Sequence, residues 1–349
     1  MDPLLPVATP PSNPDGGDFF GKSRSHSGGM RRSTDVFGIL VATSAGIVPL
    51  VILALLAFLL YNAWPALHFN GWGFLTGNSW NLGNQYGDLV KVRGVEVLPG
   101  ARFSILFLIF GTLASSVIAL VLAIPIGVGA AVFLADAVPP RLRNSASLLV
   151  ELLAAVPSVV FGLWGYVVLI PFTARHVYPL LGHVLAFIPF FGPPTYNGYG
   201  LLTSGIVLAL MVVPLITANM REAIAATPAA LREAGLSTGA TRFEVVRKIV
   251  LPRLRLPLIG VSTLALGRAL GETMAVLMVS GNAINGLPHN VYSPISTMAA
   301  FMVSQLDSAL QDPSGMAVSS ITEIGLILLV LSMAVNGIAR LLVSRTQPR

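Results

Sequence analysis

Cysteine is absent from the 349 residues, and only 10% of them are Asp, Glu, Lys or Arg. The lack of cysteine excludes disulfides, thiolate metal sites and cysteine nucleophiles. Soluble domains carry about 25% charged residues, so this chain cannot build the surface of an ordinary soluble enzyme. Because 54% of the residues are hydrophobic, in long charge-free runs, the composition indicates a polytopic membrane protein. In such a protein the net charge of +6 informs on which loops face the cytoplasm, and it does not indicate nucleic-acid binding.

Residues 1–35 lack an apolar run and are rich in Pro, Gly and Ser, which predicts a disordered tail. No secretory signal peptide is expected there, because the apolar core of such a peptide is missing. Residues 16–23, GGDFFGKS, match the phosphate-loop pattern G-x4-G-K-S. That pattern binds phosphate only between a buried strand and a helix, and Pro-rich sequence precedes it here. We interpret the match as chance.

Charge-free runs predict six transmembrane helices in an all-α fold. The runs cover residues 36–61, 103–135, 148–170, 201–220, 256–280 and 321–339. The second run would be about 50 Å long as a helix, against a hydrocarbon core of about 30 Å, and Pro125 predicts a break in it. Two shorter apolar pieces, 177–191 and 293–306, are expected to be re-entrant or interfacial.

The distribution of basic residues predicts cytoplasmic N- and C-termini. With six spans, sixteen of the 21 lysines and arginines fall on the cytoplasmic side and four outside, while Arg268 lies within a span. The expected organisation is a cytoplasmic tail (1–35), a membrane domain (36–342) with a cytoplasmic loop (221–255), and a second cytoplasmic tail (343–349).

Small residues recur every four positions in the second run, which predicts a close helix–helix contact there. They are Gly111, Ser115, Ala119, Ala123, Gly127 and Ala131. The general abundance of small residues in membrane helices is the alternative explanation.

The loop 221–255 contains short helical patterns, a turn at 237–239 and a third amphipathic piece from Thr241. Thr241 and Glu244 have the spacing of a capping box. At 35 residues the loop is long for a simple connector, so it is interpreted as a docking element for a soluble partner.

The same loop resembles the signature of binding-protein-dependent ABC importer permeases, E-A-A-x3-G-x9-I-x-L-P. The matching residues are Glu233, Ala234, Gly235, Gly239, Ile249, Leu251 and Pro252, with Gly235 in place of the second alanine. The resemblance implies a MetI-like permease fold in the bacterial plasma membrane and a loop that couples to an ATPase subunit.

Further stretches resemble the phosphate-specific permeases of Pst transporters. They are residues 111–113, 123–127, 151–162 and 267–275. The outer loop with Phe74, Leu75 and Trp80 is more similar to the PstC group than to the sister PstA group. The resemblance implies phosphate import, a PstA-like sister permease, PstB-like ATPase subunits and a PstS-like phosphate-binding protein outside the membrane. It implies no cofactor, no enzymatic reaction and no nucleic-acid partner.

Arg268 stands at the midpoint of the fifth predicted span, with Glu272 one turn later on the expected helix. A charge at that depth is costly, so it should face the bundle interior or a wet cavity. Its guanidinium suits an oxyanion, and the resemblance places Arg268 and Glu272 on the substrate path. The alternative is that Arg268 and Glu272 form a purely structural ion pair. A third possibility combines the two roles, with Glu272 holding Arg268 until phosphate arrives.

Three more residues are candidates for lining the path: Glu151, Ser158 and Thr273. Glu151 and Glu323 stand at the edges of spans, where mainly structural roles are expected. The five histidines are scattered without ligand spacing, so no metal site is predicted. The remaining alternatives are a permease for sulfate or molybdate, an ion-coupled secondary transporter and, more remotely, a membrane enzyme.

Overall fold

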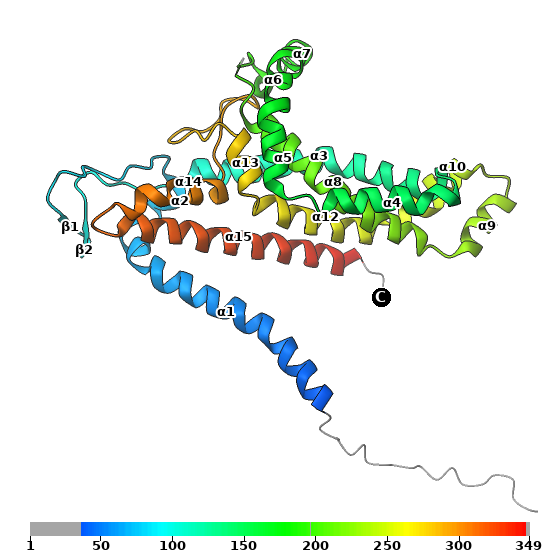
Figure 1. Cartoon of the computed structure of the whole chain (residues 1–349), viewed down its shortest axis with the longest axis horizontal. Coiled ribbons are helices and arrows are strands. Elements are labelled where there is room, and N and C mark those ends of the chain that lie inside the picture. Colours follow the sequence, from blue (N-terminus) through cyan, green and yellow to red (C-terminus); the bar gives the residue numbers. More distant parts are fainter. Residues whose placement is uncertain (1–35, 196, 347–349) are drawn as a thin grey trace, which may run out of the picture. The chain divides into compact units, whose positions relative to one another are not determined.

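A computed structural model describes residues 36–195 and 197–346 and shows them to be almost entirely helical (Figure 1). The chain divides into two units, residues 1–53 and 54–349, and the first contains only the beginning of helix α1 (Val36–Asn70) among the described residues. The predicted tail and its phosphate-loop match lie outside the described residues. A hairpin of β1 (Val90–Val92) and β2 (Val95–Val97) forms part of the outer loop.

The second unit contains the remaining helices. They are α2 (Gly73–Thr76), α3 (Leu106–Val132), α4 (Pro140–Ala154), α5 (Ser158–Trp164), α6 (Ile170–Phe172), α7 (Tyr178–Val184), α8 (Leu201–Ala225), α9 (Ala229–Ser237), α10 (Arg242–Val245), α11 (Leu251–Arg253), α12 (Arg255–Leu270), α13 (Met274–Val279), α14 (Met298–Leu310) and α15 (Met316–Thr346). π-helical turns extend several of them, at Phe133–Ala137, Gly165–Leu169, Thr173–Val177 and Val246–Val250, and a short 3-10 turn covers Pro189–Phe191.

Among the described residues, five helices are long and apolar enough to cross a membrane: Thr43–Asn70, Leu106–Ala137, Ser158–Val184, Leu201–Ala225 and Met316–Leu341. A sixth candidate is the pair Arg242–Arg253 and Arg255–Leu270, bent by 66° at Leu254. The all-α polytopic prediction is confirmed, with five spans or six. Helix α15 continues to Thr346, so the proposed C-terminal tail begins within a helix.

Three predicted boundaries are wrong. Helix α3 runs through Pro125 without a break. Pro125 is exposed, so the backbone hydrogen bond that it cannot make lies away from the face of α3 that packs on α8. That packing keeps the parts of α3 before and after Pro125 in line. The third span begins at Ser158 rather than at residue 148, because Pro157 disfavours the helical conformation at Val156. It then continues to Val184 and takes in the beginning of the short piece 177–191.

The predicted small-residue contact is confirmed as the packing of α3 against α8. All six small residues of the stripe are buried. Ala119, Ala123 and Ala131 share one core with Leu208 and Ile216 of α8. Across the same contact the Thr217 hydroxyl donates to a carbonyl oxygen of α3 at 3.3 Å. Close backbone approach of this kind stabilises membrane helices where lipid supplies no hydrophobic contrast.

A second core joins the outer loop to α14 and α15. Trp80 packs edge to face on Phe103 and Phe301, with ring centroids 4.8 and 5.0 Å apart. Phe107 of α3 meets Phe301 at 5.9 Å. Helix α14 is only 13 residues long and lies within this core, in agreement with the prediction that residues 293–306 do not form a full span.

Candidate coupling and translocation sites

The signature residues of the loop lie on two helices joined by a tight turn. Glu233 and Ala234 are exposed on α9. The third signature residue, Gly235, is buried on the opposite face, where an added Cβ would lie 2.6 Å from Ile249 and 3.0 Å from Val245. The glycine at this position thus lets α9 pack closely on the following helix.

Gly239 forms the turn that follows α9. Its φ is +84°, which side chains other than glycine adopt only with strain, and no atom lies within 4 Å of an added Cβ. The structure shows the left-handed backbone in open space, so conformation alone requires the glycine.

Thr241 caps α10 through the predicted capping box. The Thr241 hydroxyl accepts from the Glu244 amide N–H at 3.3 Å, and the Glu244 carboxylate accepts from the Thr241 amide N–H at 3.0 Å. Lys248 lies 3.2 Å from the same carboxylate. The bond from the Thr241 backbone and the neighbouring Lys248 ammonium lower the pKa of Glu244.

The end of the signature connects the loop to the membrane helices. Leu251 and Pro252 form α11, directly before the 66° bend at Leu254. Val250 and Leu254 are buried in the core shared by α3 and α8, and Leu251 packs against that core. The loop residues 221–255 are thus held to the membrane domain by apolar contacts at their C-terminal end.

Two ion pairs fasten the same loop to the membrane domain. The Arg232 guanidinium of α9 lies 2.6 Å from the Asp136 carboxylate, in the π-helical turn after α3, and also donates to the Ile224 carbonyl. Arg221, near the end of α8, lies 3.3 Å from Glu151 of α4. Glu151, predicted as a path-lining candidate, therefore lies beside the loop and has a cationic partner there.

The fifth predicted span is broken after Arg268. Helix α12 ends at Leu270 and α13 begins at Met274, so Glu272 lies in the break and not one helical turn above Arg268. Glu272 accepts a hydrogen bond from the Thr273 amide at 3.2 Å. In the described part of the chain no carboxylate lies within 4.0 Å of Arg268. The expectation that Glu272 holds Arg268 in an ion pair is wrong for this structure.

Arg268 belongs to an exposed face of α12. Gly260, Leu264 and Arg268 recur every four residues and are all exposed, whereas Val261, Ala265 and Ala269, each one position further along the helix, are buried. The guanidinium is thus directed away from the chain's own core. An unpaired arginine on such a face is available to a ligand or to a neighbouring subunit.

The other path candidates have local roles in the structure. Ser158 is the half-buried first residue of α5, and Thr273 lies in the break, where its hydroxyl donates to the Gly271 carbonyl. Glu323, expected at the edge of a span, is instead buried in α15 and accepts from the Asn70 amide, 253 residues away, at 2.9 Å. No sequence signal marks that contact.

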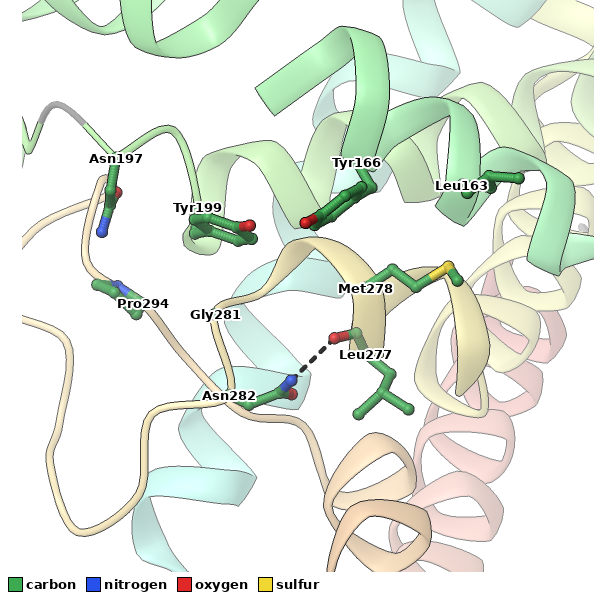
Figure 2. A pocket seen from close by; sticks show the side chains of 9 residues that line it. All are labelled: Leu163, Tyr166, Asn197, Tyr199, Leu277, Met278, Gly281, Asn282 and Pro294. Carbon is green, nitrogen blue, oxygen red and sulfur yellow. Dashed lines mark hydrogen bonds between the residues drawn. The ribbon is translucent and has the colours of Figure 1, made fainter. Parts of the chain in front are cut away.

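A cavity of about 570 Å³ lies beyond the break, between α5, α13 and the loops that follow them (Figure 2). Its polar lining is neutral and comes from Tyr166, Tyr199, Asn197 and Asn282. The Asn282 amide donates to the Leu277 carbonyl at 2.9 Å, which fixes one wall. Sequence reasoning did not find this cavity, because its residues are spread over 130 positions without a motif. Across the described residues no group of three metal-ligating side chains occurs.

Residues 123–348 match a known protein family, the inner membrane components of binding-protein-dependent transport systems. Phosphate transport system permease protein PstC 1 of Mycobacterium bovis is 43% identical over 288 residues, covering 81% of this chain and 85% of the relative. PstC of Mesorhizobium japonicum is 37% identical, covering 90% and 92%. The chain belongs to the PstC family of permeases. It is a multi-pass inner-membrane transport subunit and not an enzyme.

Distant relatives and solved structures are also similar. The probable PstC of Methanocaldococcus jannaschii is 31% identical over 88% of this chain and 92% of the relative. Inward-facing MetNI methionine transporter has a TM-score of 0.49 at 17% identity, covering 69% of this chain and 94% of that one. A bacterial alginate importer has a TM-score of 0.49 at 15% identity, covering 69% and 79%. Membership of the family confirms the predicted ABC importer permease class, whose systems include ATPase and binding-protein partners.

Proposed function

We propose that this chain forms half of the translocation path of an ATP-driven phosphate importer. A PstA-like sister permease supplies the other half, PstB-like ATPases bind the coupling loop, and a PstS-like protein delivers phosphate from outside. The names of the relatives, which are phosphate permeases, support the substrate. The single observation that carries the path is Arg268, an exposed arginine without a carboxylate partner among the described residues, two positions before the end of α12 and the break that follows.

The break itself favours a path over a purely structural role. Irregular backbone at membrane depth persists only where it is buried in protein or lines a wet cavity. Transporters place such discontinuous helices at their substrate sites. The break at 271–273 follows Arg268 and leads through α13 to the neutral 570 Å³ cavity. Phosphate would thus meet hydroxyl and amide groups first and a guanidinium at mid-membrane.

Glu272 gives a physical reason to favour phosphate over sulfate or molybdate. At neutral pH phosphate keeps at least one hydroxyl, which can donate to a carboxylate, whereas sulfate has only acceptors. Arg268 supplies fork-like donors for the oxyanion, and Glu272, half-buried in the break, supplies an acceptor. The pair would then act on the substrate rather than on each other.

Coupling to the ATPase would use the exposed side of α9 and the Gly239 turn. Glu233 and Ala234 face outward there, and Pro252 is also exposed, while Gly235, Ile249 and Leu251 pack against the segment's own neighbours. The signature thus divides into residues that would contact the partner and residues that hold the segment in place.

Vesicle uptake by the reconstituted complex tests the proposal. Arg268→Met with Glu272→Leu removes both charges at similar volume, so charges with a merely structural role would tolerate the change. We expect the double variant to assemble but not to transport labelled phosphate, while Arg175→Met, an exposed arginine elsewhere, transports normally. Substantial phosphate uptake by the double variant would refute the path. Uptake of sulfate in place of phosphate by the unaltered complex would favour the other oxyanion class.

A further inference from the structure

A basic cavity lies where the coupling loop meets the membrane domain. It has a volume of about 340 Å³ and is lined by residues of the turn after α3 and of α4, α9 and α10, which lie at the same end of the second unit (Figure 1). Its charged lining is Asp136, Arg143, Arg232 and Arg242. An adjoining cavity of about 510 Å³ shares Arg143 and Arg232.

The charge of this cavity is not balanced. Arg232 is neutralised by Asp136 at 2.6 Å. Arg143 and Arg242 have no carboxylate within 4.0 Å in residues 36–195 and 197–346. Two uncompensated guanidinium groups on different helices, α4 and α10, therefore line one small space.

Two residues that line the cavity each have a buried polar atom without a hydrogen-bond partner among the described residues. The Nε of Arg143 is a donor without an acceptor, and the Oδ2 of Asp136 is an acceptor without a donor. Unsatisfied buried polar atoms are rare and point to an unseen ligand or water. Hydrogen phosphate matches both atoms, because its oxygens accept and its hydroxyl donates. A carboxylate side chain or sulfate would satisfy the arginine but not Asp136.

We propose that this cavity binds inorganic phosphate from the cytoplasm. The proposal rests on the proposed function, which makes phosphate the transported product and orients this end inward. Arg143 and Arg242 line a space of about 340 Å³, which a small ion enters more readily than an acidic side chain of a docked protein. Bound phosphate would bridge α4 and α10 and so stabilise the present arrangement of the coupling loop. A ligand that favours one arrangement slows any cycle that must leave it, so internal phosphate would slow further import.

Direct binding is measured on the assembled complex in nanodiscs, with Arg268→Met and Glu272→Leu removing the path site. Calorimetric titration with inorganic phosphate counts the binding sites per complex. Adding Arg143→Gln and Arg242→Gln should lower that count by one. Sulfate should bind at least about tenfold more weakly, since a charge-assisted hydrogen bond is lost. Unchanged phosphate binding after the two glutamine substitutions would overturn the site.

Transport by proteoliposomes tests the consequence, with the ATPase side facing the lumen. Initial uptake should slow as lumenal phosphate rises, and Arg143→Gln with Arg242→Gln should raise the half-inhibiting concentration by at least about tenfold. Arg175→Gln, at an exposed arginine outside the cavity and the coupling loop, should behave as wild type. Uptake insensitive to lumenal phosphate, or loss of ATPase binding in the double variant, would refute the proposal. Complete absence of phosphate uptake by the wild type would instead refute the proposed function.

Discussion

The coupling loop and the fifth membrane span are consecutive in the chain, yet two arginines of the loop have surroundings opposite to those of Arg268. Arg221 and Arg232 hold the loop to the membrane domain, and each binds a carboxylate. Arg268 lies on an exposed helix face without such a partner in the described part of the chain. The comparison separates charges that fix a segment in place from a charge left available. Substitutions at the two kinds of position should therefore have different effects.

The largest effect is expected at Arg268. Arg268→Lys keeps the charge but replaces the planar fork by a point ammonium. We expect the initial rate of phosphate uptake to fall at least about tenfold, with complex assembly unchanged. The rate is measured with labelled phosphate in proteoliposomes, and Arg175→Lys is the control. Wild-type uptake by Arg268→Lys would mean that the charge at this position has a structural role, as Arg221 and Arg232 have in the coupling loop.

The ion pair between Asp136 and Arg232 should come next. Both side chains are about a quarter exposed, at 26% each. Asp136→Asn should therefore weaken ATPase binding by about 1–2 kcal/mol, after allowing for solvent screening. Affinity is measured by titration of the labelled ATPase. The swap of Asp136→Arg with Arg232→Asp should restore part of it. Glu151→Gln is the matched control, since Glu151 is 54% exposed in its pair and its loss should change affinity less than about threefold.

A smaller effect is expected from the backbone at Gly239. Gly239→Val forces a β-branched residue to φ +84° and should cost about 1–2 kcal/mol. Gly239→Asn should cost less, because asparagine tolerates this region. Hydrogen exchange of the turn amides measures the difference. Equal protection of the turn amides from exchange in the two variants would contradict the conclusion that backbone conformation requires the glycine.

The capping box should give the smallest effect and a defined pH dependence. Thr241→Val removes the cap and should cost about 1 kcal/mol in local stability. The pKa of Glu244 is lowered in the folded state, so its contribution is complete above the ordinary glutamate value of about 4.3 and is lost as pH falls through the lowered value. Hydrogen exchange of α10 between pH 7 and pH 3 should show this loss in wild type. Glu244→Gln should remove the pH dependence.

The sequence predicted the local structure of the loop 221–255 well because its signals are local. The cap at Thr241, the glycine turn and the proline at 252 each act within a few residues. The break after Leu270 contains no proline, and its position depends on contacts made by α12 and α13 with other helices, which spacing does not reveal. Pro125 gave the opposite error: a local signal for a break was overridden by the packing of α3 on α8. The pairing of Glu323 with Asn70 is likewise a tertiary contact.

The α3–α8 contact has a consequence for motion. Its faces are closed by alanines and serines in van der Waals contact, so neither water nor an anion can pass between the two helices, and sliding them apart would open voids on both sides. We expect the two helices to move as one rigid body when the transporter changes its access. The backbone rotation must then concentrate at the joints that surround them: Pro157, the bend at Leu254 and the break at 271–273. The last of these hinges directly follows the arginine that we propose to meet the substrate.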